Sequence, residues 1–246
     1  EDADGDFYVS DLNAAGVASN QSNRSEGITG KCLVMITEDA DRTMNTFLGI
    51  TSTFGPEQIE ESVIAQSQYI YIEGYLVAAD AGFEAAQVAQ KYAQGNGTKV
   101  SLTLSDPFIV ATFKERMAAL VDAGVDMLFC NEDEAKMFTG AETTADAIDA
   151  LYKQTAGFAV TCGADGARVH DGGDLVHSPG FAVEAIDTNG AGDSFAGAYL
   201  YAVTNGYATE QAAKLATYVS SRVVGKYGPR FEDKLTGEDI ARILEL

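Results

Sequence analysis

The run DTNGAGDSFAGAYLY, residues 187–201, joins a strand-like stretch at Phe181–Ile186 to an apolar helix. Small residues at the start of this helix leave room for a ligand to approach the backbone closely. The first N–H groups of a helix lack partners within the helix, and the helix dipole adds positive potential there. The pattern therefore predicts an anion site built from the backbone at Gly190, Ala191 and Gly192.

Asp193 falls in the first turn of the same helix, where backbone donors and the helix dipole favour an ionised carboxylate. A carboxylate beside an anion site can accept the proton of an incoming hydroxyl, as a base must do in phosphoryl transfer. The same residues also suit a purely structural turn, with glycines for the bend and Asp193 as a partner of the helix dipole. From these residues alone the two interpretations are equally good.

Outward from this run, short apolar strands alternate with helices. Strands are expected at residues 69–72, 99–104, 127–130 and 159–162, then a hairpin at 167–170 and 175–178, and helices at 56–66, 79–93, 108–123, 133–138, 144–154, 194–204, 209–226 and 236–244. This alternation predicts an α/β fold in which helices cover both faces of a mostly parallel sheet. The first fifty residues are expected to be β-rich, with strands at 31–37 and 42–48. We therefore expect a partial β lid and the start of the core in residues 1–55, and an α/β core in residues 56–246.

The chain is strongly acidic, with 37 Asp and Glu residues against 16 Lys and Arg, and a net charge of -21. This charge repels phosphate backbones and argues against nucleic-acid binding. No apolar run approaches the roughly 18 residues of a membrane span, so a membrane-embedded protein is not expected. The cysteines are Cys32, Cys130 and Cys162, without a CxxC pair. They favour a reducing cytoplasm over a disulfide framework or a zinc site.

Two common motifs are absent. The pairs Gly30-Lys31 and Gly225-Lys226 lack the residues that a Walker A loop needs around its Gly-Lys pair. The GDSFA sequence at residues 192–196 is similar to a hydrolase nucleophile elbow, but that elbow requires a histidine later in the chain. Both histidines come earlier, so a serine hydrolase is disfavoured.

The whole run at residues 187–201 resembles the C-terminal signature of the ribokinase-like (PfkB-type) family of carbohydrate and nucleoside kinases. The resemblance implies a three-layer α/β domain with a small β lid, whose core carries the nucleotide site. It also implies that Asp193 is the catalytic base, and that the amides of Gly190, Ala191, Gly192 and Asp193 form the anion hole. The implied reaction converts MgATP and a hydroxymethyl group into ADP and a phosphate ester.

A second motif agrees with this family. The sequence NEDE at residues 131–134 follows an expected strand and resembles the family's N-x-x-E motif. The resemblance implies that Asn131 and Glu134 organise Mg²⁺ through water. Taken alone, the same residues are an ordinary pattern for capping a helix.

A third motif lies on the nucleotide side. The sequence TCGADG at residues 161–166 resembles the family's T-x-G-x-x-G loop, which would place Thr161, Gly163 and Gly166 beside the nucleotide. Taken alone, it is a turn with glycines at positive φ. The stretch Thr209–Arg230 resembles the helix and loop that flank the adenine in this family.

The stretch CLVMITEDADRTMNTFLG, residues 32–49, resembles the adenosine-kinase-like branch of the family. In that branch an arginine at the position of Arg42 reaches the transferring phosphoryl group, where an acidic chain needs a cation. Adenosine is therefore the first expected acceptor, and a fructokinase- or ribokinase-type sugar is the alternative.

Family members normally begin with a strand and a Gly-Gly-Asn segment that hold the acceptor, and nothing in this sequence matches either. We therefore expect Glu1 to correspond to a position well inside the family fold. A catalytically incompetent fragment that binds a nucleotide or a sugar is the alternative from another functional class. The exposed edges expected for the lid strands are compatible with a homodimer through the lid.

Overall fold

The computed structural model describes residues 1–19, 25–37, 42–231 and 234–246. Its main sheet has six strands in the order β3-β4-β5-β6-β7-β8. They are β3 (Tyr69–Ile72), β4 (Lys99–Thr103), β5 (Met127–Asn131), β6 (Gly157–Thr161), β7 (Ala167–Asp171) and β8 (Val176–Ser178). The first four are parallel, and the β6–β7 and β7–β8 pairs are antiparallel. The prediction of an α/β fold with a mostly parallel sheet is therefore confirmed.

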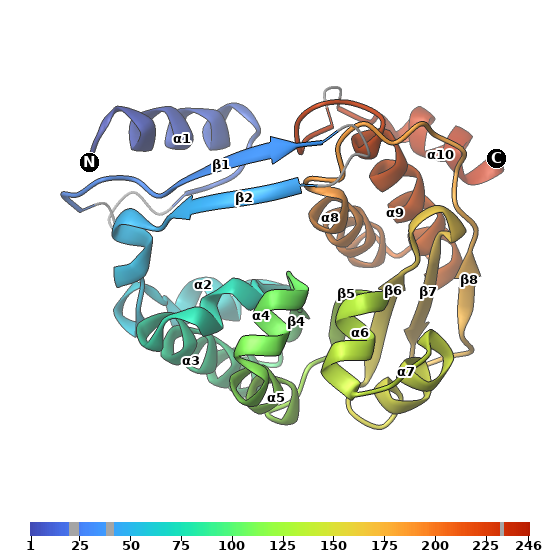
Figure 1. Ribbon diagram of the computed structural model, residues 1–246, viewed down its shortest axis with the longest axis horizontal. Coiled ribbons are helices and arrows are strands. Elements are labelled where there is room, and N and C mark those ends of the chain that lie inside the picture. Colours follow the sequence, from blue (N-terminus) through green and yellow to red (C-terminus); the bar gives the residue numbers. More distant parts are fainter. Residues whose placement is uncertain (20–24, 38–41, 232–233) are drawn as a thin grey trace.

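Helices cover both faces of this sheet (Figure 1), because successive side chains of a strand point to opposite faces. In β5, Leu128 and Cys130 join one buried cluster, whereas Met127 and Phe129 join the other. The first cluster packs under α2 (Glu61–Ala65), α3 (Asp80–Asn96), α4 (Pro107–Thr112), α5 (Lys114–Asp122), α6 (Glu132–Thr139) and α7 (Thr144–Leu151). The second packs under α8 (Ala191–Thr204), α9 (Thr209–Val224) and α10 (Gly237–Glu245). The chain thus has three layers, and the glycine-rich run leads into α8.

A separate antiparallel hairpin lies beside the first helix, away from the main sheet (Figure 1). These elements are α1 (Ala3–Ala14), β1 (Lys31–Ile36) and β2 (Arg42–Phe47). The hairpin exposes the large apolar side chains of Leu33, Met35 and Phe47. Because a two-stranded sheet is marginally stable on its own, contacts such as the Lys31–Asp4 ion pair between β1 and α1 help to hold it.

The structure corrects the expectation that the first fifty residues are β-rich, because α1 occupies part of them. The Asp2 carboxylate caps this helix by accepting a hydrogen bond from the Gly5 amide at 2.8 Å. None of its side chains is buried. The helix therefore lacks the apolar periodicity by which a buried helix is recognised in a sequence.

Three expected elements have a different structure. The helix expected at residues 108–123 is two helices, which meet at Phe113. The helix expected at residues 56–66 is a short 3-10 turn at Pro56–Gln58 followed by α2. The strand-like stretch Phe181–Ile186 joins no sheet; the Ile186 amide instead donates to the Val224 carbonyl at 2.9 Å, at the end of α9. Apolar content alone did not distinguish these arrangements.

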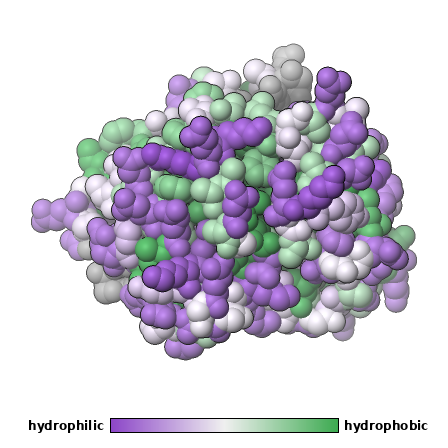
Figure 2. Space-filling model, turned by 90° about the horizontal axis from the view of Figure 1, so that it is seen from below, coloured by the Kyte–Doolittle hydropathy of each residue, from purple (hydrophilic) through white to green (hydrophobic). Residues whose placement is uncertain are grey.

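The surface agrees with the acidic composition. Hydrophilic residues dominate the face of the molecule shown in Figure 2. Within the described ranges, no helix combines the length and the apolar character needed to cross a bilayer.

Candidate active site

The carboxyl ends of the parallel strands meet at one edge of the sheet, where open α/β folds bind their ligands. On β3 and β5, Tyr71 and Phe129 pack toward the α8 layer. Asn131, the last residue of β5, lies on that face because side chains alternate along a strand, and Glu73 directly follows β3 with an extended backbone. This edge therefore gathers polar groups in front of the start of α8.

The glycine loop before α8 is shaped by close packing at one position and by open space at another. Gly190 caps the helix with φ of 75°, and a Cβ there would lie 2.5 Å from both the Cβ and the carbonyl oxygen of Pro229. Only glycine combines a positive φ with the absence of a Cβ. At Gly192, by contrast, a Cβ would meet no atom within 4 Å. The protein's own packing does not require glycine at this second position, which suits close approach by a ligand.

The buried Asp187 carboxylate stabilises this loop through hydrogen bonds. Asp187 is 1% exposed, and its carboxylate accepts hydrogen bonds from the amides of Asn189 at 2.8 Å and Gly228 at 2.9 Å. The Ser220 hydroxyl of α9 donates to the Ala191 carbonyl at 3.0 Å. The first turn of α8 is thereby fixed to α9 and to the loop that carries Gly228. These contacts hold the backbone of the predicted anion loop in one conformation.

Three carboxylates, those of Glu73, Glu134 and Asp193, act on Tyr71 at this edge. Partial burial and then the negative charge of Asp193 raise the pKa of Glu73. Burial raises the pKa of Tyr71 far above its usual value, and the charges of Glu73, Asp193 and Glu134 raise it further. Asp193 and Glu134 therefore both lie within electrostatic range of Tyr71. Glu73 and Tyr71 are additions that the sequence analysis did not identify.

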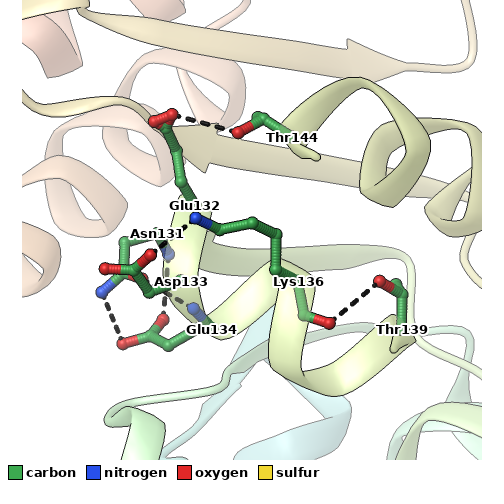
Figure 3. A network of polar contacts seen from close by, with 7 residues as sticks. All are labelled: Asn131, Glu132, Asp133, Glu134, Lys136, Thr139 and Thr144. Atoms are coloured by element: carbon green, nitrogen blue, oxygen red, sulfur yellow. Dashed lines mark hydrogen bonds and ion pairs between the residues drawn. The ribbon is translucent and has the colours of Figure 1, made fainter. Parts of the chain in front are cut away.

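Asn131 and Glu134 form a complete capping box at the start of α6 (Figure 3). The Asn131 amide oxygen accepts from the Glu134 N–H at 2.8 Å, and the two Glu134 carboxylate oxygens accept from the Asn131 backbone N–H and side-chain amide, both at 2.9 Å. The Glu134 side chain is 5% exposed. The capping interpretation of the motif is therefore realised in this structure.

The same pair also has the chemistry that magnesium requires. Mg²⁺ prefers oxygen ligands and usually keeps several of its waters. Each Glu134 oxygen accepts one hydrogen bond from Asn131 and keeps a lone pair for a water molecule of such an ion. The outer acidic residues of the motif face elsewhere: Glu132 accepts from Thr144 at 3.1 Å, and Asp133 pairs with Lys136 at 2.8 Å (Figure 3).

The TCGADG sequence forms the tight turn between β6 and β7. The Cys162 amide donates to the Gly166 carbonyl at 2.8 Å. Gly166 has φ of 89°, and a Cβ there would lie 2.0 Å from the Ser178 carbonyl oxygen. Gly163 has φ of 53° and open space around it, and the Thr161 hydroxyl lies 3.5 Å from the Cys130 carbonyl. Packing within the protein therefore requires glycine at Gly166, whereas the space beside Gly163 is open.

Arg42 is the first residue of β2 and pairs with Ile36 across the hairpin. Its side chain lies outside the described part of the structure, so its expected contact with a phosphoryl group stays a prediction.

Glu73 and Tyr71 were not predicted from the sequence, because both belong to the short stretch YIYIE, whose apolar residues indicate only a buried strand. A signal was present: an acidic residue directly after a parallel strand lies at the ligand-binding edge. Its proximity to Asp193 depends on how α8 packs across the sheet, and the local sequence does not reveal that.

Comparison with known proteins agrees with this geometry. A family model described as pfkB family carbohydrate kinase matches residues 1–235. Adenosine kinase 1 of Arabidopsis thaliana is 26% identical, over 95% of this chain and 72% of its own length.

Two solved structures are also similar. The adenosine kinase from Sinorhizobium meliloti has a TM-score of 0.92 at 31% identity, covering 100% of this chain and 75% of that one. A probable sugar kinase protein from Rhizobium etli CFN 42 has a TM-score of 0.93 at 31% identity, covering 99% and 74%. The family match and these structures show that the chain belongs to the pfkB family of carbohydrate kinases, and that it is a small-molecule kinase with the ribokinase-like, adenosine-kinase-like fold.

Proposed function

We propose that this chain transfers a phosphoryl group from ATP to a hydroxymethyl group of a nucleoside or a sugar, with adenosine as the first candidate. The observation that carries the proposal is the place of Asp193. It lies in the first turn of α8, directly after an open glycine loop, and its charge reaches Glu73 and Tyr71. A carboxylate so placed can take a proton while the adjacent amides hold negative charge.

In the proposed reaction, Asp193 accepts the proton of the acceptor hydroxyl as the hydroxyl oxygen bonds to the terminal phosphorus of ATP. The bond from that phosphorus to the bridging oxygen breaks, and ADP leaves with its electron pair. The amides at Gly190, Ala191, Gly192 and Asp193 stabilise the charge that builds up on the transferring group. Positioning and electrostatics supply most of the catalysis in such a reaction.

The nucleotide would be held by groups from neighbouring loops. Magnesium, when bound, neutralises part of the phosphate charge. Asn131 and Glu134 would hold the ion through water, and Thr161, Gly163 and Gly166 would line the nucleotide. In a chain of net charge -21, these backbone and metal contacts offset the repulsion of a polyanion.

The acceptor would lie against Glu73 as well as Asp193. A carboxylate is an acceptor of hydrogen bonds, so Glu73 favours a ligand with several hydroxyl groups, such as a ribose or another sugar. The name of the Arabidopsis relative supports adenosine, and that of the Rhizobium etli structure keeps a sugar open.

The hairpin of β1 and β2 would act as a lid that carries Arg42 toward the phosphoryl group. Its exposed Leu33 and Met35 are compatible with a homodimer through the lid. The free thiols of Cys32, Cys130 and Cys162 suit a reducing cytoplasm.

The test is an ADP-release assay of the purified chain with adenosine and a panel of sugars, alongside calorimetric titration with MgATP. The proposal expects ADP release that depends on the acceptor and disappears in Asp193→Asn. ATP binding without turnover on any acceptor would instead favour the nucleotide-binding fragment.

A further inference from the structure

An ion pair joins α1 to the loop that follows α9. The Nη2 atom of Arg230 lies 2.5 Å from the Oδ2 atom of Asp11. The hydrogen bond from Arg230 lowers the pKa of Asp11 below its usual value, so both partners are charged at neutral pH. The two residues lie near opposite ends of the sequence, so the pair connects two distant parts of the chain.

On one side of this ion pair, α1 is fixed to the hairpin. The Asp2 carboxylate accepts hydrogen bonds from the Thr29 N–H at 2.8 Å and from the Thr29 hydroxyl at 2.5 Å. Lys31, the first residue of β1, pairs with Asp4 of α1. The elements α1, β1 and β2 are therefore tied to one another, and we call them the lid unit. Its strand β2 begins with Arg42, the residue expected to approach the transferring phosphoryl group.

On the other side, Arg230 directly follows the residues that shape the glycine loop. Pro229 packs so closely on Gly190 that a Cβ there would lie 2.5 Å from it. The Gly228 amide donates to the buried Asp187 carboxylate at 2.9 Å. Because the chain is continuous from Gly228 to Arg230, a displacement of Arg230 acts on the backbone that holds the predicted anion loop.

Resting on the proposed function, we propose that Asp11 and Arg230 are positioning residues, whose ion pair couples the lid unit to the glycine loop that receives the phosphates. The Arg230 side chain is 61% exposed, and exposed ion pairs contribute little to overall stability. A small contribution is sufficient here, because it shifts the populations of two lid positions by a few-fold and still lets the lid open. The pair thus favours the arrangement in which lid and anion loop face the same ligand.

The variant Asp11→Asn tests this, since it removes the charge and keeps the shape of the side chain. The KM for MgATP should rise roughly two- to fivefold, because a smaller fraction of the protein is ready to bind. Bound nucleotide restores the arrangement, so kcat should stay within about twofold of wild type. An unchanged KM would overturn the proposal.

Reversal of the pair separates coupling from the other roles of either residue. Asp11→Arg and Arg230→Asp should each raise the KM for MgATP at least as much as Asp11→Asn, since like charges then face each other. The double variant should return to within about twofold of wild type, because the attraction is restored with its sign exchanged. A double variant as impaired as the Arg230→Asp single variant would overturn the proposal, since Arg230 would then act without Asp11.

Asp80→Asn is the matched control. It removes an exposed aspartate that pairs with Arg116, so the net charge changes equally, but this pair joins α3 to α5 within the core. Its KM for MgATP should equal that of wild type. An equal rise of KM in Asp80→Asn and Asp11→Asn would also overturn the proposal, because it would reflect net charge alone.

A second measurement does not depend on turnover. In the ligand-free protein, Asp11→Asn should speed hydrogen exchange roughly two- to fivefold in the peptides covering residues 225–231 and 187–195, and Asp80→Asn should not. Exchange that stays at the wild-type rate would overturn the coupling. If exchange speeds up but the wild type phosphorylates no acceptor, then the proposed function fails while the coupling by Asp11 and Arg230 stands.

Discussion

The two ends of the central sheet differ in how their polar side chains are paired. At the amino end, the Tyr199 hydroxyl donates to the Asp171 carboxylate at 3.1 Å, and the Lys99 side chain is bound to the Tyr69 hydroxyl. The partners in these two pairs are of opposite character and satisfy one another, although the buried Nδ1 of His170 at the same end has no partner among the described residues. A cavity of about 610 Å³ is lined by Tyr69, Lys99 and Asp171 and by the turn between α8 and α9.

At the carboxyl end, like groups face one another. The charge of Asp193 raises the pKa of Glu73, and the hydroxyls of Tyr71 and Ser105 have no partner among the described residues. Ser105 is also the one non-glycine residue there with positive φ, 69°. Backbone strain and unpaired polar groups persist in proteins mainly where function requires them. We infer that the amino end serves stability and that the carboxyl end serves ligands.

The largest expected effect is on kcat, and it should distinguish two aspartates, one from each end of the sheet. Asp193→Asn should lower kcat by roughly 10²–10⁴-fold, because a base is lost, while ATP affinity and the free energy of unfolding change little. Asp171→Asn should keep kcat, since it lies at the far end of the sheet. Steady-state kinetics and calorimetry on both variants check this. A near-normal kcat in Asp193→Asn would show that Asp193 is not the base.

Two glycines at opposite ends of α8 offer the next comparison. Gly190 and Gly206 both have positive φ, but a Cβ meets Pro229 at Gly190 and nothing within 4 Å at Gly206. Gly206→Ala should cost roughly 1–2 kcal/mol for the left-handed backbone. Gly190→Ala should cost roughly 1–3 kcal/mol more for overpacking, and it should also impair turnover. Urea unfolding measures both variants. Equal losses would show that the loop yields to the added methyl group.

The sequence was sufficient for the layers of the fold and for part of this contrast. Buried strands such as YIYI and helices with apolar periodicity mark the sheet and its cover, because burial leaves a local pattern. The pattern DTNGAGD likewise placed an open glycine and Asp193 at a helix start. The helix α1 was missed because it buries no side chain. Tyr71 and Glu73 were missed because their relation to Asp193 arises only from packing across the sheet.

A smaller effect concerns the hydroxyl of Tyr199. Tyr199→Phe should lower the free energy of unfolding by about 1 kcal/mol, because Asp171 loses a partner and the ring packing remains. Its kcat should match wild type. A fall in kcat without a change in stability would contradict the division between the two ends.

The smallest effect is a pH dependence of stability. Because the folded state raises the pKa of Glu73 above its ordinary value, ionising this group disfavours folding. Its unfavourable contribution grows as the pH rises from the unfolded pKa through the folded pKa, and it is absent at pH values below both. Glu73→Gln should therefore be slightly more stable than wild type at pH 7 and not at pH values below both pKa values. Urea unfolding at the two pH values decides the matter, and a gain that is independent of pH would exclude repulsion from Asp193 as the cause.

Hydrogen exchange with and without MgATP shows which end of the sheet binds the nucleotide, because it reports on both ends in one unmodified protein. We expect MgATP to slow exchange in the peptides covering residues 187–195 and 161–166 at the carboxyl end. Exchange in the peptide covering residues 203–209, beside the amino-end cavity, should stay unchanged. Slower exchange at residues 203–209, with residues 187–195 unaffected, would instead place the nucleotide at the amino end.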